Sequence, residues 1–126
     1  MRDAIMDHDW RHSPSLSLDW RLARVRDYLA RLPLDSVRGI VFGSVARRAF
    51  GIGSDTDLLV ISSCLPADVR GRIDLLGDHR DALGEIDPLG WTEADWSRRL
   101  AAGDPFAELL AREGIEVDIG RANVAR

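Results

Sequence analysis

The chain has 126 residues, the length of one domain, and its 45% hydrophobic and 30% charged residues are typical of a globular protein. No apolar run approaches the roughly 20 residues that a membrane-spanning helix needs, and the first residues, MRDAIMDHDWRH, contain no apolar signal-peptide core. A formal net charge of −4 argues against non-specific binding to long nucleic acid. We therefore expect a cytoplasmic protein without a membrane partner.

Polar and terminal segments set the expected domain bounds. We expect a polar lead over residues 1–15, one domain over residues 16–120 and a tail over residues 121–126. His8 and His12 in the lead are four residues apart, a spacing that could bind a metal on a helix, but no third ligand is evident and we interpret them as surface residues. Cys64 is the single cysteine, which excludes an internal disulfide and favours a buried, unreactive thiol.

The first half of the domain predicts a helix, a strand and a short helix in succession. Apolar residues at spacings of four and three predict a helix that Pro33 ends, with Leu18, Leu22, Val25, Leu29 and Leu32 on its buried face. The β-branched and aromatic run at 37–42 predicts a buried strand. A tight turn then leads from Ser44 into a short helix, and the segment GIGS at 51–54 predicts a loop.

The second half predicts two more strands with helices between and after them, and then a closing strand. Residues 55–62 predict a strand, and Pro66 is expected to open a helix that carries Val69, Ile73 and Leu76. Residues 85–91 predict a weaker strand, which Pro88 places at a sheet edge. Two helices follow, one capped by Thr92 with Asp95 and closed by Gly103, the other running from Asp104 and Pro105 to Gly114, before a strand at 115–119. This order predicts an α/β (α+β) fold, a mixed sheet with packed helices.

Two aspartates at the start of the second predicted strand carry the first chemical signal. Because side chains alternate along a strand, Asp55 and Asp57 should share one face, with Thr56 on the other. Two carboxylates at the start of an apolar strand repel each other, so we expect a cation between them. Oxygen ligands without a neighbouring cluster of His or Cys favour Mg²⁺ over zinc or copper.

A Gly-Ser pair ahead of the aspartates supplies the complementary signal. Gly43 lets the backbone approach an anion, and the helix that starts at Ser44 offers free N–H groups to phosphate. Alone, each motif is weak, because exposed aspartates and Gly-Ser turns are common. Together, in the order strand, Gly-Ser, helix, loop, paired aspartates and strand, they indicate a site for a nucleoside triphosphate with magnesium.

The stretch VFGSVARRAFGIGSDTDLLV resembles the signature of the DNA polymerase β-like nucleotidyltransferases, and especially of the minimal nucleotidyltransferases. The resemblance implies the single-domain fold of that family, with Asp55 and Asp57 holding two Mg²⁺ ions while Gly43 and Ser44 engage the triphosphate of ATP. It also implies a third carboxylate on a neighbouring strand, which ligates metal and helps to deprotonate the attacking hydroxyl. In an in-line displacement, the two metals stabilise the attacking and leaving oxygens.

The third carboxylate has one candidate by position and one alternative. Asp87 lies in the next strand after the intervening helix, although Pro88 and Gly90 interrupt the apolar run that usually follows this residue in the family. Glu85, two residues earlier, is the alternative, whereas Asp118 is interpreted as an exposed residue on an edge strand.

Arg47 matches an arginine that is frequent in the family's Gly-Ser helix, and it could contact phosphate oxygens. A solvated helix charge is an equally good interpretation of this residue.

The resemblance implies transfer of a nucleoside monophosphate, AMP from ATP, to a hydroxyl. A domain of this size lacks room for an acceptor domain, so the acceptor is expected on a partner protein or in a cleft formed by an oligomer. Members of this kind pair with a helical HEPN-type toxin and act as its antitoxin. Two alternatives stay open: a binding module that covers a toxin without catalysis, and a small-molecule nucleotidyltransferase of the aminoglycoside-modifying type.

Overall fold

The computed structural model describes residues 12–80 and 85–120. Most of the polar lead, including His8, and the tail at 121–126 lie outside the described residues. A short 3-10 helix, η2 (Pro14–Leu16), precedes α2 (Leu18–Arg31), and β1 (Arg38–Phe42) leads directly into α3 (Gly43–Ala46). The chain continues through β2 (Thr56–Ile61), α4 (Val69–Asp78), β3 (Ile86–Trp91), α5 (Glu93–Ala101), α6 (Pro105–Glu113) and β4 (Ile115–Asp118).

The four strands form one mixed sheet in the order β3-β2-β1-β4. β1 pairs antiparallel with both β2 and β4, whereas β2 pairs parallel with β3. The predicted α+β class and element order are confirmed, and Pro88 does lie in an edge strand. An edge strand accepts proline because one side of its backbone needs no partner in the ladder.

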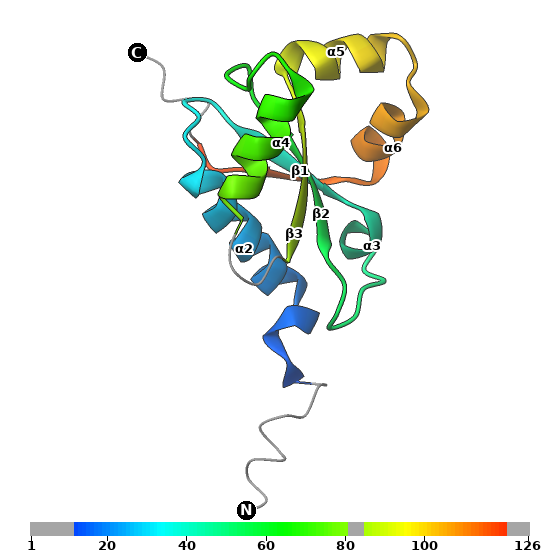
Figure 1. Cartoon of the computed structure of the whole chain (residues 1–126). Coiled ribbons are helices and arrows are strands. Elements are labelled where there is room, and N and C mark those ends of the chain that lie inside the picture. Colours follow the sequence, from blue (N-terminus) through cyan, green and yellow to red (C-terminus); the bar gives the residue numbers. More distant parts are fainter. Residues whose placement is uncertain (1–11, 81–84, 121–126) are drawn as a thin grey trace, which may run out of the picture.

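Helices cover both faces of the sheet, and the core is correspondingly divided in two. Figure 1 shows α2 and α4 on one side and α5 and α6 toward the other, while α3 follows the end of β1 and packs Val45 into the cluster of the α2 side. One cluster of buried residues joins α2 to alternate residues of the strands, including Val25, Leu29, Leu58 and Val60. The second joins the opposite residues to α6, including Leu59, Ile61 and Leu110. The strand alternation that separates Leu58 from Leu59 therefore fixes which side chains can reach the α6 side.

Local capping explains where most helices begin. Ser17 accepts a hydrogen bond from the Trp20 amide at the start of α2, and Thr92 with Asp95 forms the predicted capping box of α5. Asp104 caps α6 ahead of Pro105, also as predicted. Within residues 12–80 and 85–120, no helix combines the length and apolar character needed to cross a membrane.

Helix α4 corrects two expectations. It begins at Val69 and not at Pro66, because the Asp68 side chain accepts a hydrogen bond from the Gly71 amide at 2.8 Å and supplies a cap that the sequence reading overlooked. Of the three apolar residues expected on its buried face only Leu76 is buried, while Val69 and Ile73 are 69% and 61% exposed.

One further expectation fails outside α4. Cys64 is exposed, not buried, because it lies in the turn after β2. The predicted short helix after β1 is confirmed: α3 is a single turn that begins at Gly43 and ends at Ala46, since Arg48 has a left-handed backbone with φ of 58° and cannot continue a right-handed helix.

Candidate active site

Gly43 lies where β1 turns into α3, directly against Asp57. Phe42, the last residue of β1, pairs with Asp57 of β2, so the following residue turns over the aspartate. Gly43 has a φ of +72°, and a β-carbon at this position would overlap Oδ2 of Asp57. Glycine is therefore required twice here, by the backbone conformation and by the close approach.

The sheet register brings two of the predicted carboxylates side by side. Asp57 pairs with Asp87 across the parallel β2–β3 ladder, and residues opposite one another in a sheet project to the same face. Asp55 precedes β2, and its charge acts on Asp57. Thr56 points the other way and is 3% exposed, which confirms the predicted alternation.

The electrostatics of Asp57 follow from this crowding. Burial raises the pKa of its carboxyl above the ordinary value, and the charges of Asp87 and Asp55 raise it further, while Arg47 acts in the opposite direction. Among the described residues, none forms a salt bridge with these three carboxylates. The site therefore concentrates negative charge that a bound cation would relieve.

Ser44 and Arg47 flank the carboxylates from α3. Ser44 is half-buried in the single turn of that helix, whose first N–H groups have no intrahelical acceptor. Arg47 is the exposed residue that ends the turn, and its charge acts on Asp57. Because α3 has only four residues, its macrodipole is small, and the local N–H groups are the feature that could favour an anion.

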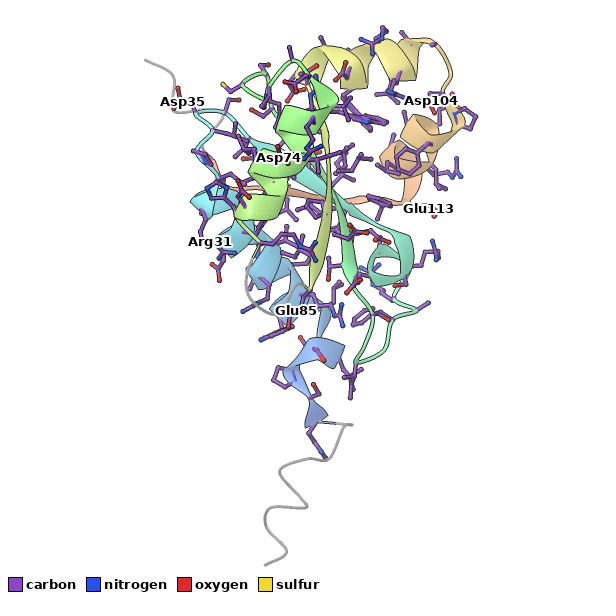
Figure 2. All side chains as sticks on the ribbon, viewed as in Figure 1. Arg31, Asp35, Asp74, Glu85, Asp104 and Glu113 are labelled. Atoms are coloured by element: carbon purple, nitrogen blue, oxygen red, sulfur yellow. The ribbon has the colours of Figure 1, made fainter. Side chains whose placement is uncertain are left out.

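The structure separates the two candidates for the third carboxylate. Glu85 lies ahead of β3, beside α2 (Figure 2), and its Oε1 is 2.9 Å from Nη2 of Arg24. Asp87 is exposed and is the register partner of Asp57. Asp87 is thus the residue placed next to the aspartate pair, while Asp118 is exposed on the edge strand β4, as predicted.

The donor set suits magnesium held jointly with a phosphate. In the described part of the chain, no group of three or more His, Cys, Asp and Glu side chains is arranged so that it could hold a metal ion by itself. Mg²⁺ is usually bound by one or two carboxylates together with substrate phosphates and water, and not by an all-protein cage. Asp57 and its neighbours fit that mode, and the phosphates would provide the remaining oxygens.

An apolar groove begins next to Asp87 and runs between α4, β3 and α5. Its volume is about 440 Å³, and its walls include Val69, Ile73 and Leu89, three of the large apolar side chains that are exposed in the described residues. Arg72, paired with Asp95 at 2.8 Å, lies along it. The sequence reading missed this groove because it assigned Val69 and Ile73 to the core.

Arg21 is a second feature that the sequence reading missed. It is 3% exposed, and its guanidinium reaches the loop that precedes Asp55. The available signal was its position, four and eight residues before Val25 and Leu29 on the buried face of α2.

Replacing Gly43 tests the close approach to Asp57. Gly43→Ala should lower the free energy of unfolding by about 1–3 kcal/mol, because alanine is strained at positive φ and its methyl group displaces the carboxylate. Chemical denaturation measures the change. Gly77→Ala is the control, since open space surrounds Gly77 and alanine favours its helix. Equal stability of Gly43→Ala and the wild type would contradict the geometry.

Replacing Asp57 tests the crowding of charge. A carboxyl whose pKa is raised by folding destabilises the fold when it is ionised, so this cost is present at neutral pH and disappears as the pH falls below that pKa. Asp57→Asn should therefore raise the thermal midpoint at pH 7, and the gain should shrink on acidification. The exposed Asp35, replaced by Asn, is the control. A destabilised Asp57→Asn protein at pH 7 would show that the carboxylate is not strained.

Comparison with known proteins agrees with this fold. A family model described as a nucleotidyltransferase domain matches residues 22–94. A crystal structure from Sulfolobus solfataricus, described provisionally as a nucleotidyltransferase, has a TM-score of 0.52, with 20% identity over 68% of this chain and 80% of the other. At that identity the likeness shows a shared fold. No curated protein matches the sequence at a significant level.

The matched segment contains the Gly-Ser turn and all three candidate carboxylates, and it spans more than half of the chain. The chain therefore belongs to the nucleotidyltransferase domain family.

Proposed function

We propose that this protein transfers AMP from ATP to a hydroxyl group of a partner protein in a magnesium-dependent reaction. The observation that carries the proposal is the register of Asp57 with Asp87, beside the backbone turn at Gly43. That arrangement puts carboxylate oxygens next to backbone that an anionic triphosphate could approach. The family supports nucleotidyl transfer, while the base, the acceptor and the partner are our proposals.

Each residue has a defined task in the proposed reaction. Asp55, Asp57 and Asp87 would hold Mg²⁺, which lowers the cost of charge on the attacking and leaving oxygens. Gly43 and Ser44 would receive the triphosphate through backbone N–H groups, and Arg47 would contact a phosphate oxygen. Asp87 would accept the proton of the acceptor hydroxyl as its oxygen bonds to the α-phosphorus. The bond from that phosphorus to the bridging oxygen breaks, and pyrophosphate leaves.

The apolar groove supports a protein as the acceptor. Exposed apolar surface of this kind, rimmed by charged residues, is typical of protein interaction sites. The groove starts at Pro88, next to the proposed base, so a protein bound there could direct a hydroxyl toward Asp87. We propose a helical HEPN-type toxin as this partner, with the present chain as its antitoxin.

One observation favours a second candidate, a small-molecule nucleotidyltransferase. A groove of about 440 Å³ falls within the roughly 300–1,000 Å³ that drug-sized ligands occupy. A small hydroxylated acceptor could therefore use the same groove.

Joint binding of metal and nucleotide tests the site. ATP titrated calorimetrically should bind with Mg²⁺ and only weakly without it, because carboxylates and phosphates repel each other until a cation lies between them. The double variant Asp55→Asn, Asp57→Asn should lose this magnesium dependence. Unchanged binding in that variant would show that the nucleotide binds elsewhere.

Label transfer tests the acceptor and the base together. With α-labelled ATP, Mg²⁺ and the protein encoded by the adjacent gene, label should appear on that protein. Asp87→Asn should reduce the rate by about 10²–10⁴-fold, the usual effect of losing a positioned base, whereas Glu85→Gln should retain most of it. A complex without label would favour the non-catalytic binding module. Label on added aminoglycosides alone would establish the second candidate.

A further inference from the structure

The Arg21 side chain joins α2 to the loop that precedes the aspartate pair. Its Nε donates to the Ser15 carbonyl at 2.6 Å, and its Nη2 donates to the Gly51 carbonyl at 2.9 Å. Its Nη1 donates to the Ser54 carbonyl at 2.6 Å and to Thr56 Oγ1 at 3.1 Å. Four of its hydrogen bonds therefore end on residues 15, 51, 54 and 56, and three of them hold the segment that leads into β2.

Burial makes these contacts hard to replace. Arg21 is 3% exposed, and its guanidinium carbon lies 4.7 Å from the centre of the Phe50 ring. A charged group removed from water needs its hydrogen bonds satisfied, so displacing the loop would leave donors unpaired. Lysine presents one compact ammonium in place of a planar guanidinium and cannot reach four acceptors that are spread over η2, the loop and the start of β2.

The contacts hold the loop and set the direction of Thr56. The loop is closed by hydrogen bonds from the Gly51 amide to Ser54 Oγ, at 2.9 Å, and from the Ser54 amide to the Gly51 carbonyl, at 3.2 Å. Arg21 donates hydrogen bonds to the carbonyls of both of these turn residues and to the Thr56 hydroxyl. Because strand residues alternate, a Thr56 side chain held toward α2 requires Asp55 and Asp57 to point to the opposite side.

We infer that Arg21 is a positioning residue of the nucleotidyl-transfer site: it fixes the 51–56 segment so that Asp55 and Asp57 face the metal and triphosphate. The inference rests on the proposed function for what the aspartates bind. The anchoring of the loop itself stands on the hydrogen bonds alone.

Two variants and one matched control test the inference on the full chain. Arg21→Lys keeps the charge but removes the planar guanidinium and its several N–H donors. Thr56→Val, which removes only the hydroxyl acceptor, is the second variant and serves if Arg21→Lys folds poorly. Arg38→Lys is the control, because Arg38 also forms a fork, with Nε and Nη2 donating to Glu93 and Nη1 to Glu116. Arg38 lies opposite Ile61, at the other end of the β1–β2 ladder from Asp57.

The first measurement is binding of Mn²⁺ with a non-hydrolysable ATP analogue, by calorimetry, beside the thermal midpoint of each protein. Arg21→Lys should weaken binding by about 10- to 100-fold, as is usual for residues that orient metal ligands, and Thr56→Val should weaken it less. Arg38→Lys should lower the thermal midpoint without weakening binding. If Arg21→Lys lowers only the midpoint, or if both arginine variants weaken binding equally, Arg21 is merely structural and the inference is wrong.

The second measurement needs no metal or nucleotide. Amide hydrogen exchange at Ser54 and Thr56 should accelerate by about tenfold or more in Arg21→Lys and stay unchanged in Arg38→Lys. If the wild type does not bind the Mn²⁺–nucleotide complex, the proposed function fails while this exchange still decides whether Arg21 holds the loop. Unchanged exchange in Arg21→Lys would overturn the inference whatever the nucleotide result.

Discussion

The contact between the Gly43 backbone and the Asp57 carboxylate is the constraint on which the site depends. It exists because β1 ends opposite Asp57 and because the next residue, which has no β-carbon, turns at positive φ. Asp87 is held beside Asp57 by the register of the parallel ladder. Burial and like charge together make the ionised Asp57 costly for the fold, and a bound cation would recover that cost.

The two faces of the sheet carry different residues: the candidate catalytic carboxylates lie on one face, and the buried residues that pack against α2 lie on the other. Asp57 and Asp87 project to one face, while Thr56 and Ile86, the neighbouring register pair, are buried on the face covered by α2. Helix α2 reaches the starts of both strands, through Arg21 to the loop before β2 and through Arg24 to Glu85 before β3. Charged residues on α2 thus stabilise the edge of the sheet at which the carboxylates gather.

Features with a local cause could be predicted from the sequence. The capping box at Thr92, the edge position of Pro88 and the alternation around Thr56 each follow from a few adjacent residues, and the structure confirms all three. The Gly-Ser turn and the aspartates were recognised because family and chemistry coincide in one short stretch. Their roles in binding and catalysis stay predictions.

Features that depend on distant contacts could not be predicted. Burial of Val69 and Ile73 was expected from their spacing with Leu76, yet they face the groove, because the side chains of α4 that pack on the core are Leu76 and the partly buried Leu75. Arg21 has no local signature, since three of its four acceptors lie 30 to 35 residues away, in the loop before β2 and at the first residue of β2. The choice between Glu85 and Asp87 likewise required the sheet register and the ion pair with Arg24.

Paramagnetic broadening by Mn²⁺ in the amide NMR spectrum measures most directly whether the carboxylates and the Gly-Ser turn form one site for metal and nucleotide. With ATP present, substoichiometric Mn²⁺ should broaden the amide signals of Gly43, Ser44, Asp57 and Asp87 and leave those of Glu116 and Asp118 on β4 sharp. Without ATP, the broadening should be much weaker, because the phosphates provide part of the ligand set. Broadening centred on β4, or none at Asp57 and Asp87 with ATP present, would contradict a nucleotide-dependent metal site at this position.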